Sequence, residues 1–257
     1  MSQAELAPSC SGLGSGRAAD NCVLVICGAA GDLTRRELIP SLFELFQDKL
    51  LPEACAIIGF SRADWDDDTF RKQMRAAHEE FAGPVDAAQW DRFAACLGFV
   101  PGDFTAPADG PYAALAQRIA TEQQRRSIPD NVLFHLATPP VVYEEIVGKL
   151  AACGLAKSDG GWRRVVIEKP FGADAASAAH LDQVVRAVFP GALTMLLVKG
   201  NTESRIWESF AAQPCTVEEF DVKPTRTLPA HNAMMQESNV DLFAASVQAF
   251  LARTRSS

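Results

Sequence analysis

The stretch from residue 22 to residue 40, CVLVICGAAGDLTRRELIP, limits what the chain can fold into more than any other. Its first six residues are apolar and rich in β-branched side chains, which is typical of a parallel strand buried on both faces. The run stops at a glycine turn, and the apolar residues beyond it recur at roughly helical spacing. These segments are Cys22 to Cys27, Gly28-Ala29-Ala30-Gly31, and the series Leu33, Leu38, Leu42, Leu45 and Phe46. The stretch therefore predicts a strand, a glycine turn and a helix.

That order of elements is the first half of a dinucleotide-binding unit. Glycines in such a turn let the backbone approach a pyrophosphate at the start of the helix, where unpaired N–H groups and the helix dipole favour an anion. The match is imperfect, because Ala30 stands where the usual G-x-G-x-x-G pattern has its second glycine. Two interpretations therefore stand at this point, a nucleotide site and an ordinary connection between a strand and a helix.

Strands and helices continue to alternate along the chain. Buried strands are expected at 54–60, 132–138 and 164–167, a short strand with a turn at 97–104, and helices at 64–81, 86–96, 112–126, 141–153 and 175–188. This rhythm predicts an α/β fold, a Rossmann-like doubly wound and mostly parallel sheet. We expect a disordered lead-in over 1–20, a nucleotide-binding domain over 21–189, and a short, divergent or truncated C-terminal α/β segment over 190–257. That last segment is predicted to hold a strand at 193–198 and helices at 203–212 and 240–253.

Charge and composition exclude several classes of function. The chain of 257 residues has a net charge of −8, which argues against binding nucleic acid or an anionic membrane surface. No apolar run approaches the roughly 20 residues of a membrane span. The seven cysteines are scattered without a C-x-x-C pair, and no cluster of His, Cys, Asp or Glu has the spacing of metal ligands. We expect a reduced, cytoplasmic protein without a metal.

The end of the second predicted strand bears on the choice of cofactor. In a Rossmann unit an acid there accepts from the 2′-hydroxyl of NAD, whereas an arginine can pair with the 2′-phosphate of NADP. Arg62 follows the strand and therefore indicates NADP. The alternative is that Arg62 is a solvated charge partnered by Asp64. Asp66, Asp67 and Asp68 come next and are expected to form a solvated helix start.

Three segments are expected to meet at one edge of the sheet, because ligands of such sheets bind outside the carboxyl ends of the strands. They are Gly28 to Gly31, Thr138-Pro139-Pro140 and Glu168-Lys169-Pro170. Lys169 is then either a surface lysine or a cation directed at an anionic substrate, and its position at the shared edge favours the second. His135 lies inside a predicted strand and is expected to pack in the sheet.

Four motifs together resemble a known family. They are the segment GAAGDLTRR from Gly28, IGFSR ending at Arg62, LATPP ending at Pro140, and VIEKPFG ending at Gly172. In this order and spacing they are similar to the coenzyme domain of glucose-6-phosphate dehydrogenase, over about residues 20 to 189.

The resemblance implies a cofactor, a substrate and a set of contacts. NADP would bind with Arg62 on its 2′-phosphate, and a hydride would leave C1 of glucose 6-phosphate to give the lactone, a reaction of the pentose phosphate pathway. Lys169 would also contact the substrate, and Pro170 would shape the junction between the two ligands. The implied cofactor-binding residues are Gly28, Ala29, Ala30, Gly31, Asp32, Leu33, Arg62, Ala137, Thr138, Pro139 and Lys169.

The departures from the family pattern concern catalysis. The family usually has a lysine where this chain has Glu37, and the stretch R-I-D-H-Y-L-G-K-E, which supplies phosphate-binding groups and opens the catalytic domain, does not occur. His231 is the one histidine of the C-terminal segment and the only candidate there for the histidine base that hydride transfer from a hydroxyl needs. An NADP-dependent dehydrogenase and a catalytically inactive NADP-binding module both fit. The family's usual dimer surface belongs to the part that does not match, so an oligomer is compatible with the sequence but not defined by it.

Overall fold

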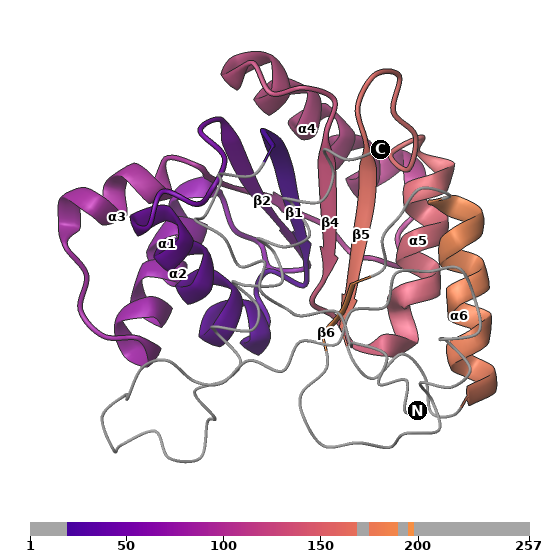
Figure 1. The fold of residues 1–257 in the computed structure, drawn as a ribbon. Coiled ribbons are helices and arrows are strands. Elements are labelled where there is room, and N and C mark those ends of the chain that lie inside the picture. Colours follow the sequence, from indigo (N-terminus) through magenta and orange to yellow (C-terminus); the bar gives the residue numbers. More distant parts are fainter. Residues whose placement is uncertain (1–19, 169–174, 190–194, 198–257) are drawn as a thin grey trace, which may run out of the picture.

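The computed structural model describes residues 20–168, 175–189 and 195–197 (Figure 1). Within these ranges six strands form one sheet in the order β3-β2-β1-β4-β5-β6, and every neighbouring pair is parallel. The strands are β1 (Cys22–Cys27), β2 (Cys55–Ser61), β3 (Leu97–Pro101), β4 (Val132–Leu136), β5 (Arg163–Glu168) and β6 (Met195–Leu197). The chain thus builds outward from β1 in one direction and then in the other, which confirms the predicted doubly wound topology.

The helices connect consecutive strands, as parallel pairing requires. They are η1 (Thr34–Leu38), α1 (Ile39–Gln47), α2 (Asp67–Phe81), α3 (Ala87–Ala94), η2 (Ala108–Tyr112), α4 (Ala113–Arg126), η3 (Pro140–Val142), α5 (Tyr143–Ala152) and α6 (Ala175–Val188). All predicted helices up to residue 188 are confirmed, with small differences at their ends. The largest is at α2, which begins at Asp67 because the Asp66 carboxylate accepts from Thr69 N at 2.7 Å and caps it. The helices predicted at 203–212 and 240–253 lie outside the described residues.

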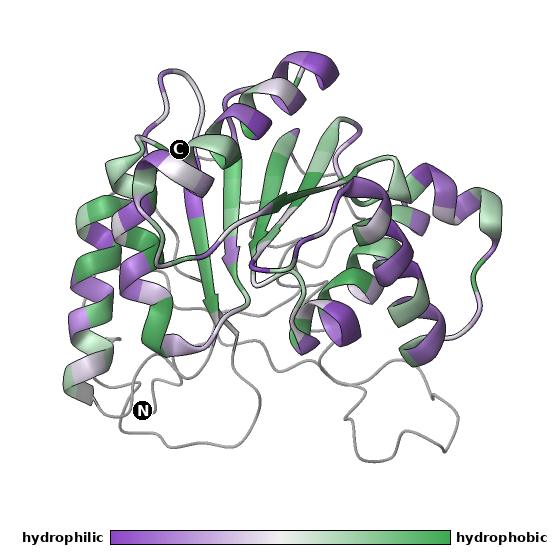
Figure 2. Ribbon diagram, turned by 180° about the vertical axis from the view of Figure 1, so that it is seen from behind, coloured by the Kyte–Doolittle hydropathy of each residue, from purple (hydrophilic) through white to green (hydrophobic). Residues whose placement is uncertain are grey.

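Helices cover both faces of the sheet and enclose two cores. Figure 1 shows α1, α2 and α3 on one side and α5 and α6 on the other. Strand β1 contributes side chains to both cores. Val23 and Val25 pack with α4, α5 and α6, whereas Leu24 and Ile26 pack with α1, α2 and α3. Figure 2 shows the resulting pattern, with largely apolar strands between helices that are partly hydrophilic. The continuous apolar run of β1 therefore reflects burial on two sides.

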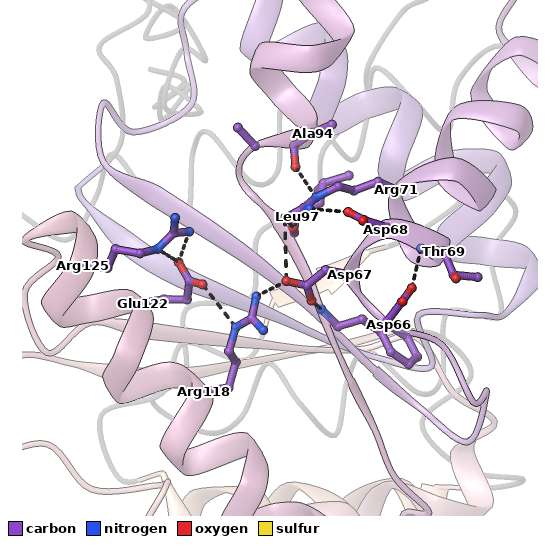
Figure 3. A network of polar contacts seen from close by, with 12 residues as sticks. Asp66, Asp67, Asp68, Thr69, Arg71, Ala94, Leu97, Arg118, Glu122 and Arg125 are labelled. Carbon is purple, nitrogen blue, oxygen red and sulfur yellow. Dashed lines mark hydrogen bonds and ion pairs between the residues drawn. The ribbon is translucent and has the colours of Figure 1, made fainter.

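A network of charged side chains covers the edge strand β3 (Figure 3). Asp67 accepts from Phe99 N and from Arg118 Nη2, both at 2.7 Å. The expectation of a solvated Asp67 is therefore wrong, because the edge strand β3 offers it an N–H that β2 does not take. Asp66 and Asp68 are exposed, as expected.

Helix α4 joins the network through Arg118, which also donates to Glu122, a residue whose side chain is only 6% exposed. Its carboxylate accepts from Arg118 Nε at 3.1 Å, Arg125 Nη2 at 2.7 Å and Arg126 Nε at 2.9 Å. Burial raises the pKa of Glu122, but hydrogen bonds from Arg125 and Arg126 and the charges of the arginines outweigh burial and hold it below its ordinary value. Glu122 is therefore charged in the folded protein at neutral pH.

Among the described residues no helix is long and apolar enough to span a bilayer.

Candidate functional site

The glycine turn after β1 lies against the end of β4. Gly28 has a φ of +95°, a conformation that favours glycine. A Cβ at this position would also overlap the carbonyl oxygen of Ala137. Hydrogen bonds fix the approach, since Gly28 N donates to Phe60 O at 2.8 Å and Ala137 N donates to Cys27 O at 2.8 Å. The turns after β1 and β4 therefore form one close-packed unit at the point where the strand order reverses.

The turn passes directly into a helix. Gly31 N donates to Gly28 O at 2.8 Å, Thr34 Oγ1 donates to the same carbonyl at 3.3 Å, and Arg35 N donates to Gly31 O at 3.2 Å. The chain is helical from Asp32 onward, with a π-helical turn at η1. The first N–H groups of a helix have no acceptor within it, so this end of η1 can receive an anion. A Cβ on Gly31 would come within 3.0 Å of Gly28 O.

Three buried polar atoms of these segments have no hydrogen-bond partner among the described residues. They are Ser61 Oγ at the end of β2, Arg35 Nε in η1, and Thr138 Oγ1 beyond β4. The Thr138 methyl group lies 3.0 Å from where a Gly28 Cβ would stand. A buried polar group without a partner costs about 1–3 kcal/mol, and such groups usually bind water or a ligand. Unmatched polar atoms around a glycine turn fit a polar ligand such as a dinucleotide.

Arg62 follows Ser61 at the same edge, and its side chain is exposed. Within the described ranges it forms no ion pair within 4 Å, so the structure shows no salt bridge to Asp64. Its charge acts on Asp103, whose pKa is lowered first by hydrogen bonds from the backbone and side chain of Thr105 and then by Arg62. Arg62 is therefore an exposed cation beside the turn, where an anion can reach it.

The other residues of the predicted site differ in what their side chains can do. Ala29 is fully buried among apolar residues, and Leu33 packs against the same core. Ala30 is half-buried. Asp32 accepts from Arg36 Nε at 2.7 Å and is 73% exposed. Ala29, Ala30 and Leu33 can therefore act through the backbone and shape of the turn, since their side chains carry no polar group.

The residues predicted on the substrate side lie mostly beyond what the structure describes. Lys169, Pro170 and His231 fall outside the described residues, and β5 ends at Glu168, directly before Lys169. Glu37 is half-buried in η1. His135 is 1% exposed in β4, opposite Ile26 and Val166, which confirms that it packs in the sheet.

Three residues of this edge were not identified from the sequence: Thr34, Arg35 and Ser61. Thr34 is fully buried and braces the turn through Gly28 O. Their positions in the sequence could have identified them, since Thr34 and Arg35 follow the glycine turn and Ser61 precedes Arg62. Burial of a polar atom without a partner, however, is visible only in three dimensions.

Comparison with known proteins agrees with this geometry. The family model for the glucose-6-phosphate dehydrogenase NAD-binding domain matches residues 25–193. Glucose-6-phosphate 1-dehydrogenase 2 of Mycobacterium tuberculosis is 39% identical over 176 residues, which are 68% of this chain and 34% of that protein. The glucose-6-phosphate 1-dehydrogenase of Treponema pallidum is 40% identical over 179 residues, again 68% of this chain and 34% of the relative.

Solved structures give the same result. Glucose-6-phosphate dehydrogenase in complex with glucose 6-phosphate matches with a TM-score of 0.61 and 26% identity, over 70% of this chain and 37% of that one. Glucose-6-phosphate 1-dehydrogenase from Mycobacterium avium matches with a TM-score of 0.55 and 33% identity, over 66% of this chain and 34% of that one. The chain thus spans about a third of the length of these relatives. It belongs to the glucose-6-phosphate dehydrogenase family and carries the family's NAD-binding domain.

Proposed function

We propose that this chain binds NADP at the carboxyl edge of its sheet and supplies the coenzyme half of a glucose-6-phosphate dehydrogenase. The reaction converts glucose 6-phosphate and NADP⁺ to 6-phosphogluconolactone and NADPH. The observation that carries the proposal is the close approach of the Gly28 turn to Ala137, in a chain of this family. The nucleotide-binding domain is assigned to 21–189. The described cysteines are all free, which supports a reducing, cytoplasmic setting.

Each segment of the edge has a role in holding the cofactor. The start of the helix after Gly31 would receive the pyrophosphate, because its N–H groups and dipole favour an anion. Arg62 would pair with the 2′-phosphate, and Ser61 Oγ and Thr138 Oγ1 would gain the partners they lack among the described residues. When bound, the nicotinamide ring accepts the hydride from C1 of the sugar. Lys169, directly after β5, would contact the phosphorylated sugar.

A second function, NADP binding without turnover, is favoured by two features of the sequence. The phosphate-binding stretch R-I-D-H-Y-L-G-K-E does not occur, and Glu37 places an acid where the family usually has a lysine. An acid near a sugar phosphate opposes binding through like-charge repulsion. Both functions require NADP binding. They differ only in whether the bound NADP accepts a hydride from glucose 6-phosphate.

One titration and one assay separate these functions. Calorimetry of the full chain with NADP⁺ should show binding at one site per chain, and absence of binding would contradict both functions. The same protein is then mixed with glucose 6-phosphate and NADP⁺ while the absorbance of NADPH is followed. Turnover supports the dehydrogenase, and binding without turnover supports the inactive module.

A further inference from the structure

Two cysteines lie next to each other at the amino edge of the sheet, opposite the nucleotide site. Cys55 is the first residue of β2, and Cys96 directly precedes β3. The two segments are held side by side, because Ile57 pairs with Leu97 and Ile57 N donates to Cys96 O at 2.8 Å. The two side chains interact, and each shifts the pKa of the other.

The spacing suits a disulfide. The register of β2 and β3 places Cys55 one residue before the position opposite Cys96. Adjacent strands lie about 4.8 Å apart and rise about 3.3 Å per residue, so diagonal neighbours have Cα atoms about 6 Å apart. Disulfides usually join Cα atoms about 4.4–6.8 Å apart. The Cα atoms of Cys55 and Cys96 therefore lie within the range that a disulfide spans.

The surroundings of Cys96 favour its thiolate. The guanidinium of Arg126 donates to the carbonyl of Ala95, the residue before Cys96, and to Glu122 at 2.9 Å, so its charge lies near the Cys96 sulfur. The hydrogen bond from Cys55 is the main cause that lowers the pKa of Cys96 to about 7; burial opposes it, and the charges of Arg126 and Arg125 assist. The pKa of Cys55 is raised well above its ordinary value, first by its hydrogen bond with Cys96 and then by burial.

We propose that Cys55 and Cys96 form a peroxide-sensitive dithiol, in which Cys96 reacts first and Cys55 closes a disulfide. The Cys96 thiolate attacks one oxygen of a hydroperoxide, breaks the O–O bond and becomes a sulfenic acid, while the peroxide leaves as water or an alcohol after taking a proton. The Cys55 thiol then attacks that sulfur, forms the S–S bond and releases the hydroxyl group as water. Two electrons pass from the thiol pair to the peroxide, which is the oxidant.

None of the other described cysteines combines a lowered pKa with partial exposure and a second cysteine on the neighbouring strand. Cys22 faces Cys55 in the sheet register but is 4% exposed, and burial, assisted by Asp20 and opposed by Arg164, raises its pKa to about 12. Cys27 is fully buried. Cys153 is half-buried like Cys96, but burial raises its pKa, so it is a matched internal control.

The test begins with the full wild-type chain and needs no variant. The reduced protein is exposed to limiting iodoacetamide at pH 7, and peptide mapping by mass spectrometry gives the rate at each cysteine. The lowered pKa of Cys96 and the raised pKa of Cys153 give Cys96 the larger thiolate fraction at pH 7, so Cys96 should react severalfold faster than Cys153. In a separate sample of reduced protein that has not been alkylated, hydrogen peroxide should yield one cross-linked peptide that joins residues 55 and 96. Equal alkylation rates, or a cross-link between other cysteines, would overturn the proposal.

Two substitutions at Cys55 separate its two roles. Cys55→Ser keeps a hydrogen-bond donor but removes the second sulfur, so Cys96 should stay fast and accumulate sulfenic acid, which a 1,3-dione traps. Cys55→Ala removes the donor as well, and alkylation of Cys96 should slow severalfold. Circular dichroism identifies variants that remain folded. If folded Cys55→Ser protein accumulates no sulfenic acid at Cys96, the proposed order of steps is wrong.

Discussion

The proposed preference for NADP over NAD rests on the side chain of Arg62. Its guanidinium is exposed at the end of β2, without an ion pair among the described residues. Pairing with a phosphate is charge-assisted and often bidentate, and contributes about 1.5–3 kcal/mol. Arg62→Ala should therefore weaken NADP binding about 10- to 150-fold in calorimetry and leave NAD binding nearly unchanged. Arg75→Ala, which removes a half-buried arginine on α2, is the control. Equal losses for both cofactors would place Arg62 away from the 2′-phosphate.

Gly31 tests whether the turn after β1 is a phosphate site or only a chain reversal. A side chain there would crowd Gly28 O, 3.0 Å from the new Cβ, and would stand between the helix start and a pyrophosphate. Gly31→Val should abolish NADP binding while the circular dichroism spectrum stays close to that of the wild type. Gly160→Val is the matched control, since nothing lies within 4 Å of a Cβ there. If Gly31→Val binds NADP with unchanged affinity, the turn does not bind the pyrophosphate and only connects the strand to the helix.

The buried carboxylate of Glu122 orients arginines of its own helix α4, of which Arg118 binds Asp67 and Arg126 binds the Ala95 carbonyl at the edge of the sheet. Hydrogen bonds to charged groups contribute about 1.5–3 kcal/mol, and Glu122 accepts from three arginines. Glu122→Gln should lower the free energy of unfolding by about 1–3 kcal/mol in urea titrations at pH 7. Asp68→Asn, which breaks the exposed pair with Arg71, should cost under about 0.5 kcal/mol. Equal effects of the two substitutions would contradict this role.

The stabilisation from Glu122 has a defined pH dependence. Its pKa is lower in the folded chain than in the unfolded chain, so the stabilisation is present above the unfolded value, about 4.3. It is lost as pH falls through the folded value. The difference in unfolding free energy between wild type and Glu122→Gln should therefore shrink as the pH is lowered from 7 into the acid range. A difference that stays constant or grows in acid would show that the carboxylate is not what stabilises the wild type.

The elements of this chain differ in how well their sequences predicted them. Strands such as β1 and β2 were placed almost to the residue, because an apolar run that ends at glycine or at a charge has few other solutions. The π-helical turn of η1 was missed, since residue type does not distinguish it from the α-helix that continues it. Asp67 was misassigned because its partners, Phe99 and Arg118, are distant in sequence. The lack of partners at Ser61 Oγ and Thr138 Oγ1 among the described residues likewise depends on packing.

At the scale of the part of the molecule that the structure describes, the two proposed sites lie at opposite edges of one sheet. The carboxyl edge gathers the glycine turn, Arg62 and Thr138, and the amino edge carries Cys55 and Cys96. A disulfide between these cysteines would tie β2 to β3 at the edge away from Gly28. The nucleotide site and the thiol pair can therefore be altered separately by substitution, and the experiments on each leave the other in place.

Turnover by this chain alone is expected to be very slow despite cofactor binding. General-base catalysis contributes about 10²–10⁴-fold, and positioning of the reacting groups can contribute about 7–11 kcal/mol more. The family stretch that opens its catalytic domain does not occur in this sequence, and Glu37 stands where the family usually has a lysine. NADPH formation from glucose 6-phosphate should therefore stay near the detection limit of an absorbance assay, under conditions where calorimetry shows NADP⁺ bound. The control is His231→Ala, which should leave this background unchanged. Robust turnover that His231→Ala abolishes would contradict the prediction and identify His231 as the residue that takes the proton from the sugar hydroxyl.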